Sequence, residues 1–350
     1  MANEIQAVAV PTKEKRHASQ RTRRIVADVI VYTLLVVMSI VWILPILWIV
    51  LQSFTGEYGQ SMSKWIPGIW DWEVIEGNTI IYNGQLKTFN YTLGPFGNYV
   101  MLFQNLVYNT QNKVGPSDYN FIGYVADGHF YMGGFLNTLV IAAFCAVLST
   151  MLTLMTSYAF SRLRFKGRQG MMRLIMIIGM FPGFLGLVVL YALFFKVLGW
   201  QSNIWLLILI YSGGAGMGYY ISKGFFDTIS KAIDEAAMID GATRFQIFYK
   251  ITMPLSKPII TYTILTSFMA PWAEYITANY MLGGQNQQKD NWTLPLILYH
   301  MLNRDELQLR TRYWGQFCAG AVIIAIPTSI LFAFMQKNYV GGVTGGAVKG

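Results

Sequence analysis

The sequence predicts an all-α membrane protein with six transmembrane helices. Three observations lead to this fold class: 54% of the 350 residues are hydrophobic, only 12% are charged, and the mean hydropathy is +0.40. Soluble domains carry about a quarter charged residues, so half that share indicates that lipid is the solvent. The 22 Phe, 21 Tyr and 10 Trp agree with this class, because aromatic side chains concentrate at membrane interfaces.

Six stretches reach the roughly 20 apolar residues that a helix needs to cross a bilayer. They cover approximately residues 25–54, 135–160, 174–195, 204–221, 259–281 and 316–335. Backbone polar groups find no water in lipid, so helices joined by hydrophilic connections are expected. The first stretch is too long for a cleaved signal peptide and is followed by no small-residue cleavage site.

Lys and Arg predict the orientation, because cytoplasmic connections carry an excess of them. They gather before the first span, after the second and after the fourth: Lys13, Lys15, Arg16, Arg21, Arg23, Arg24, Arg162, Arg164, Lys166, Arg168, Arg173, Lys223, Lys231, Arg244, Lys250 and Lys257. We therefore expect a cytoplasmic N-terminal segment (1–24), a cytoplasmic tail (337–350), an extracytoplasmic insert (55–134) and a core domain of five spans (135–336). The net charge of +9 then reflects topology and not binding to nucleic acid.

The insert contains a hairpin signal, "TIIYNGQLKTF". Two β-prone runs flank Asn83-Gly84, a pair that favours a type I′ turn. Three tryptophans near acids suggest either a surface that holds a sugar or a small folded cap at the membrane interface. These tryptophans are Trp65, Trp70 and Trp72.

The connection 223–257 is charged and amphipathic although apolar spans flank it. Thr228 or Ser230 can cap a first helix, and Asp234 and Glu235 then lie near the positive end of its dipole. The segment thus begins like a helix of a soluble protein.

Gly241 interrupts this helix and permits a sharp turn. A second short helix is expected from about Arg244, with an aromatic face that includes Phe245 and Phe248. Such a pair suits either a groove in another protein or the surface of the inner leaflet.

The same stretch, "EAAMIDGATRFQIFYKITMP", is similar to the cytoplasmic signature of ABC importer permease subunits: Glu-Ala-Ala, three residues, Gly, nine residues, Ile, one residue, Leu-Pro. The matching residues are Glu235, Ala236, Ala237, Gly241, Ile251 and Pro254. Met253 stands where leucine is usual, which is a conservative apolar change.

Further segments resemble the carbohydrate importers of this family. They are "NTLVIA", "SYAFSRLRFKGR" and "MFPGFLGLVVLYALFFKVLGW", and the ending "YVGGVTGGAVKG" is similar to the tail of the smaller permease subunit of maltose/maltodextrin importers. The insert 55–134 is longer than that family's usual loop, which leaves the identity of the sugar open.

The resemblance implies the type I ABC importer permease fold in a bacterial plasma membrane, with residues 223–257 forming a coupling helix seated in an ATP-hydrolysing subunit. Glu235 would anchor this helix, Ala236 and Ala237 would allow close approach, and Gly241 would supply the turn. Implied partners are a second permease subunit, two ATPase subunits, an extracytoplasmic sugar-binding protein and an oligosaccharide, with maltodextrin preferred. ATP would bind to the ATPase subunits, so the chain itself would need neither a cofactor nor catalytic residues.

The glycine-rich tail can be a frayed end. The resemblance instead implies that it reaches the interface between the ATPase subunits, through Gly345, Gly346, Lys349 and Gly350.

Glu274 is the clearest acid inside a span, and an acid in lipid indicates either a functional site or a structural pair. Tyr275 and Asn279 nearby are candidates for the transport pathway. In the external connection 283–316, Trp292 is a candidate contact for the sugar-binding protein, although an ordinary solvated loop is equally expected there.

Two other classes compete with the importer. An ion-coupled secondary transporter would show internal repeats and several midplane ionisable groups. An intramembrane enzyme would show motifs such as HExxH or GxSxG, which are absent from the sequence. The three histidines are far apart, so the sequence predicts no metal site.

Overall fold

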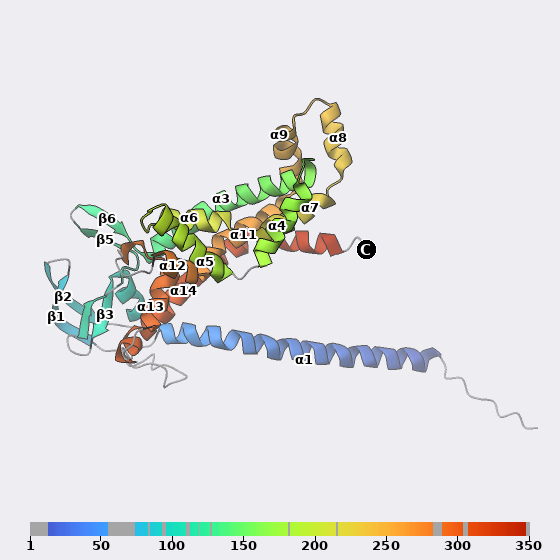
Figure 1. Ribbon diagram of the computed structural model, residues 1–350. Helices are drawn as coiled ribbons and strands as arrows, with labels where there is room; N and C mark the ends of the chain where they lie inside the picture. Colours follow the sequence, from blue (N-terminus) through green and yellow to red (C-terminus); the bar gives the residue numbers. More distant parts are fainter. Residues whose placement is uncertain are drawn as a thin grey trace, which may run out of the picture.

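The computed structural model describes residues 13–54, 74–82, 85–92, 96–109, 113–117, 119–126, 128–180, 183–214, 216–282, 289–303 and 307–347. Within these ranges the chain is mostly helical, and the insert adds strands (Figure 1). The helices are α1 Lys13–Ser53, α2 Gly97–Phe103, α3 Gly134–Arg162, α4 Arg168–Met180, α5 Gly183–Tyr191, α6 Ile204–Gly213, α7 Gly216–Thr228, α8 Lys231–Ile239, α9 Arg244–Gln246, α10 Met253–Leu255, α11 Lys257–Ala273, α12 Ile276–Leu282, α13 Leu294–Leu302 and α14 Leu307–Ala347. Two π-helical turns, Ala192–Val197 and Ile247–Thr252, follow α5 and α9, and a 3₁₀ turn, Lys289–Asn291, precedes α13.

Among the described residues, three helical stretches are long and apolar enough to cross a membrane: Thr22–Ser53, Gly134–Arg162 and Tyr313–Gln336. Two bent pairs raise the number to five if each pair is one span: Arg168–Met180 with Leu185–Val197, bent by 101°, and Ile204–Gly213 with Gly218–Thr228, bent by 43°. The predicted fifth span is not continuous, because the backbone of Glu274 is extended (φ −106°, ψ 121°) and separates α11 from α12.

The predicted hairpin in the insert is confirmed. Strands β1 (Val74–Tyr82) and β2 (Gln85–Thr92) pair antiparallel with Tyr82 opposite Gln85, and the turn residues Asn83 and Gly84 lie outside the described residues. Two further hairpins follow: β3 (Leu106–Asn109) with β4 (Lys113–Pro116), and β5 (Gly123–Ala126) with β6 (His129–Met132). The fold is therefore mostly helical and not all-α, because the described part of the insert forms antiparallel hairpins. Trp65, Trp70 and Trp72 lie outside the described residues.

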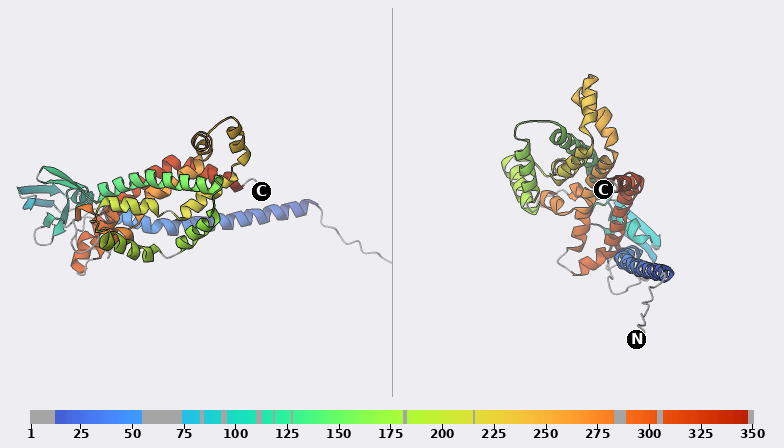
Figure 2. Two further views of the ribbon diagram at one scale, coloured as in Figure 1. Left: turned by 45° about the horizontal axis from the view of Figure 1, so that its top comes forward. Right: turned by 90° about the vertical axis from the view of Figure 1, so that its right-hand side faces the viewer.

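The core lies where α3, α6, α11, α13 and α14 meet, around side chains such as Ile141, Leu207, Trp272 and Leu296. Helix α13 packs closely against α14, since a Cβ added at Gly320 would lie 2.6 Å from Leu298 Cδ2. The strands gather at one end of this bundle, and α8 and α9 project at the other (Figures 1 and 2).

Among its described side chains, helix α1 packs on the bundle near its C-terminal end. Trp48 packs against Trp314 with ring centroids 5.5 Å apart, and Trp314 Nε1 donates to Gln52 Oε1 at 3.2 Å. The rest of α1 diverges from the bundle (Figure 1), with the large apolar side chains from Ile25 to Leu47 exposed. Such a surface needs lipid or another protein to cover it.

Candidate functional site

The amphipathic loop forms two short helices that stand out from the bundle where α3 and α7 end (Figure 1). Helix α8 begins after Ser230, as predicted, although the Ser230 side chain makes no capping hydrogen bond. Gly241 has φ +83°, a left-handed conformation that favours glycine, and it turns the chain between α8 and α9.

Helix α9 begins at Arg244, also as predicted. It is preceded by a capping box in which Thr243 Oγ1 accepts a hydrogen bond from the Gln246 N–H and Gln246 Oε1 accepts one from the Thr243 N–H. A capping box satisfies two backbone donors that the helix itself leaves free. The second helix is therefore encoded locally.

The six residues of the sequence signature all lie in this loop, and most of them face outward. Glu235, Ala236, Gly241 and Pro254 are exposed, Ile251 is half-buried and Ala237 is buried. The four exposed residues are therefore available to a partner.

Apolar side chains extend this outward surface. Ile239 is 86% exposed, Phe245 70% and Tyr249 66%. The predicted aromatic face is divided, because Phe248 instead turns inward and packs on Tyr158 of α3 with ring centroids 4.8 Å apart. A projecting surface of this composition is typical of a contact with another protein or with a membrane surface.

Sequence reasoning missed a residue that attaches α8 to the bundle. Arg162, at the end of α3, forms an ion pair with Asp234 of α8, with Nε and Oδ2 3.1 Å apart. It also donates hydrogen bonds to the carbonyls of Phe226 (3.0 Å) and Ile229 (2.8 Å) at the end of α7. From the sequence, Arg162 indicates a cytoplasmic connection, and Asp234 is expected near the positive end of a helix dipole. Neither interpretation pairs the two residues, because no spacing rule links residues so far apart in the chain.

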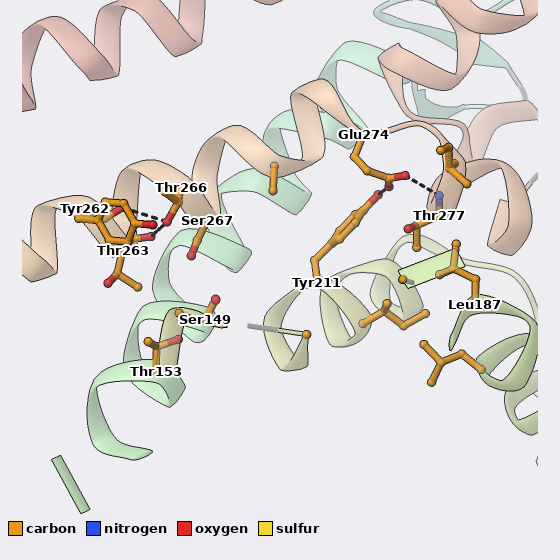
Figure 3. A pocket seen from close by; sticks show the side chains of 17 residues that line it. Ser149, Thr153, Leu187, Tyr211, Tyr262, Thr263, Thr266, Ser267, Glu274 and Thr277 are labelled. Atoms are coloured by element: carbon orange, nitrogen blue, oxygen red, sulfur yellow. Dashed lines mark hydrogen bonds between the residues drawn. The ribbon is translucent and has the colours of Figure 1, made fainter. Parts of the chain in front are cut away.

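A second candidate site is a cavity of about 710 Å³ inside the bundle (Figure 3). Hydroxyl groups from several helices line it: Ser149 and Thr153 of α3, Tyr211 of α6, Tyr262, Thr263, Thr266 and Ser267 of α11, and Thr277 of α12. Glu274 supplies the one charged side chain among the described lining residues.

Glu274 both lines this cavity and forms a structural pair. Its carboxylate accepts hydrogen bonds from the Tyr211 hydroxyl at 2.7 Å and from the Thr277 N–H at 2.8 Å. The second bond satisfies a backbone donor at the start of α12, which is the role of an N-cap. The acid is therefore held at the break in the helix.

The other two pathway candidates face away from the cavity. The Tyr275 ring stacks on Tyr299 of α13, with centroids 4.3 Å apart, and Asn279 Oδ1 lies 3.2 Å from His300 Nε2. Neither lines the cavity. Their role in transport stays a prediction.

The external connection after α12 is not an ordinary solvated loop, because it contains the buried helix α13. Trp292, just before α13, is only 8% exposed, and its ring lies 4.6 Å from that of His300. Its backbone carbonyl accepts a hydrogen bond from Asn137 Nδ2 at 3.0 Å. Contact with a binding protein stays a prediction for this buried side chain.

The insert is connected to this region through Asp290. The Tyr124 hydroxyl of β5 donates to Asp290 Oδ2 at 3.3 Å, and Asn120 Nδ2 lies 3.5 Å from Oδ1. Burial, and then the Asp290 carboxylate, raise the pKa of Tyr124. Tyr124 therefore stays a neutral donor at physiological pH.

The tail continues as helix. Gly345 and Gly346 lie in the last turn of α14, and Lys349 and Gly350 lie outside the described residues. The predicted contact of the tail with ATPase subunits stays a prediction.

Comparison of the sequence with known proteins assigns the chain to a class of transport proteins. Residues 149–344, more than half of the chain, match the family described as "Binding-protein-dependent transport system inner membrane component". The matched range includes the projecting loop and most of the helices that line the cavity. The fold and site thus define a multi-pass membrane permease.

Several curated relatives are permease proteins of sugar transport systems. The chain is 36% identical over 221 residues to the galactooligosaccharides transport system permease protein GanQ of Bacillus subtilis (strain 168). The matched residues make up 63% of this chain and 75% of the relative. It is 36% identical over 225 residues to the maltodextrin transport system permease protein MdxG of the same strain, covering 64% and 78%. It is also 36% identical over 219 residues to the maltose/maltodextrin transport system permease protein MalG of Vibrio vulnificus (strain YJ016), covering 61% and 71%.

A solved structure shares the fold over nearly the whole chain. It is a bacterial ABC transporter involved in the import of the acidic polysaccharide alginate, with a TM-score of 0.60, 18% identity, and coverage of 94% of this chain and 99% of that chain. The chain belongs to the binding-protein-dependent transport system inner membrane component family. The resemblance inferred from the signature is confirmed, and the ion-coupled alternative finds no support in these relatives.

Proposed function

We propose that this chain is the six-span permease subunit of an ATP-driven oligosaccharide importer, with α8 and α9 as its coupling element. The projecting loop carries this proposal. It combines a left-handed Gly241, an exposed Glu235 and an apolar outer surface within the range matched by the family.

In this proposal α11 and α12 together form one further span, the fifth in chain order, which raises the number of spans from five to six. The 17 residues of α11 extend over about 26 Å at 1.5 Å per residue. That is nearly the hydrocarbon thickness of about 30 Å. Helix α12 continues the path beyond the break at Glu274. Six spans keep both termini in the cytoplasm of a bacterial plasma membrane, in agreement with the basic residues at 162–173 and 223–257.

The partners follow from the loop and from the exposed α1. A second permease subunit and lipid would cover α1, and each of two permease subunits would seat its coupling element in one of two ATPase subunits. ATP would bind to those subunits, so this chain carries no catalytic role. An extracytoplasmic binding protein would deliver the sugar at the end that bears the insert and α13.

Uncharged oligosaccharides fit the cavity best. Hydroxyl groups can exchange hydrogen bonds with sugar hydroxyls, whereas Glu274, the one charged group among the described lining residues, would repel a polysaccharide acid. Maltodextrin is the preferred substrate because the tail and several spans resemble maltodextrin permeases. Galactooligosaccharide is the second candidate, because the relative that transports it is equally similar at 36% identity.

Co-purification tests the proposal. The tagged chain is co-expressed with candidate partners, as wild type, as Glu235→Lys, and as Glu235→Asp, a control that keeps the carboxylate at the same position. We expect a second permease and an ATPase to accompany wild type and Glu235→Asp, and the ATPase to be lost from Glu235→Lys. A wild-type chain that purifies alone and moves sugar into vesicles without ATP would contradict the importer.

The substrate is tested with the complete transporter in vesicles. Uptake of radiolabelled maltotriose is measured in competition with a galactooligosaccharide and with an oligouronate of the same length. The proposal expects the strongest competition from maltodextrins and the weakest from the oligouronate. Strong competition by the oligouronate would contradict a pathway for uncharged sugars.

A further inference from the structure

Helix α8 is attached to the bundle by little besides one ion pair. Of its nine residues, Asp234 and Ala237 are buried, and the others are exposed. Its two ends are Ser230, which makes no side-chain cap, and the turn at Gly241. A short helix held in this way needs a rigid link in order to transmit a movement.

Arg162 supplies a link to two other elements at once. It is the last residue of α3, it pairs with Asp234 of α8, and it donates to the carbonyls of Phe226 and Ile229 at the end of α7. The side chains of Arg162 and Asp234 are only 4% and 12% exposed. Water therefore screens this pair far less than an ion pair at the surface.

The chemistry of arginine suits a three-way junction. A guanidinium is planar and carries five donors in fixed directions, so it can pair with a carboxylate and donate to two carbonyls together. A lysine at this position would offer a single point charge on a flexible stem. The neighbouring Ser161, whose Oγ lies 2.6 Å from Asp227 Oδ1, connects α3 to α7 but not to α8.

We infer that Arg162 is a positioning residue that fixes α8 to the ends of α3 and α7, so that closure of the ATPase subunits moves these three helices as one body. This inference rests on the proposed function. It adds a role for Arg162 and Asp234 beside the signature residues, because Asp234 is buried and pairs with Arg162 whereas Glu235 is exposed.

The test uses the complete transporter in vesicles and measures sugar transported per ATP hydrolysed. Asp234→Asn and Arg162→Gln each remove one charge, and Asp234→Glu keeps the carboxylate. Lys223→Gln is the matched control, because it removes an ion pair to Asp227 within α7 and leaves the link to α8 intact. Co-purification of the ATPase is measured for every variant.

We expect Asp234→Asn and Arg162→Gln to retain the ATPase but to lose about fivefold or more of the transport per ATP, the range of a coupling free energy between sites. Asp234→Glu should recover most of the wild-type ratio, and Lys223→Gln should match wild type. If Asp234→Glu recovers the wild-type ratio, the loss in Asp234→Asn comes from the missing carboxylate and not from misfolding of the chain.

Failure of the inference and failure of the proposed function give different results. If wild type couples ATP hydrolysis to transport and both neutralised variants keep its ratio, the inference is wrong and the importer stands. If these variants lose the ATPase, the pair serves docking and the inference is also wrong. If wild type binds no ATPase, the proposed function itself fails.

Discussion

The hydroxyl of Tyr211 in α6 donates a 2.7 Å hydrogen bond to the carboxylate of Glu274, at the break between α11 and α12 (Figure 3). A carboxylate within a membrane bundle is costly unless hydrogen bonds compensate for the lost water. Tyr211 and the Thr277 N–H supply two such bonds. The same acid therefore stabilises the broken helix and gives the cavity its negative charge.

Tyr211→Phe should destabilise the bundle. It leaves one oxygen of the Glu274 carboxylate without its donor, and a hydrogen bond to a charged group contributes about 1.5–3 kcal/mol. Thermal unfolding in detergent measures the change. Tyr220→Phe, at an exposed tyrosine of α7, should unfold like wild type, and equal melting of both variants would contradict a structural role for the Tyr211–Glu274 pair.

Gly241→Ala should weaken coupling through the backbone alone. A Cβ at Gly241 meets no atom within 4 Å, so the strain comes from φ +83°, where a non-glycine residue costs roughly 1–2 kcal/mol. We expect α9 to shift relative to α8 and ATP hydrolysis to drive less transport, with a stronger loss in Gly241→Asp.

Gly224→Ala is the matched control for that experiment. Gly224 also has open space around it but lies within α7 and has no positive φ, so alanine should be tolerated there. Normal uptake by Gly241→Asp would refute the role of this turn.

Trp292→Ala should lower stability in the absence of any binding protein. The side chain is 8% exposed and packs on His300 and Tyr119, and truncation of a buried tryptophan costs about 3–5 kcal/mol. Trp42→Ala, at an exposed tryptophan of α1, should leave the melting temperature of the purified chain nearly unchanged. An unchanged Trp292→Ala melting temperature together with weaker capture of the binding protein would instead favour the surface contact predicted from the sequence.

Removal of residues 345–350 should impair ATP-driven transport without preventing assembly. The resemblance places this tail between the ATPase subunits, and loss of such a contact is expected to lower transport on the order of fivefold. Replacement of all six residues by serine keeps the length of the tail and tests whether its sequence, which includes Gly345, Gly346, Lys349 and Gly350, matters for transport. Full transport by the shortened chain would contradict a role of the tail in ATP-driven transport and would favour a frayed end.

Local sequence was sufficient for the membrane class and for the features of the loop. Low charge and long apolar runs indicate lipid as the solvent, and the Asn83-Gly84 hairpin, the turn at Gly241 and the helix start at Arg244 each depend on neighbouring residues. The spaced signature from Glu235 to Pro254 also identified the family, because its residues belong to one continuous stretch.

Only the tertiary structure decided the remaining features. Helix α13 is a short apolar run without a distinctive period, and the break at Glu274 interrupts a run that reads as a continuous span. The pairs Arg162–Asp234 and Tyr211–Glu274 join residues that are distant in the chain, so no spacing in the sequence could predict them. The sequence thus determines that lipid surrounds this protein and where its local turns lie. The packing of helices that are distant in the chain decides which polar and charged side chains pair.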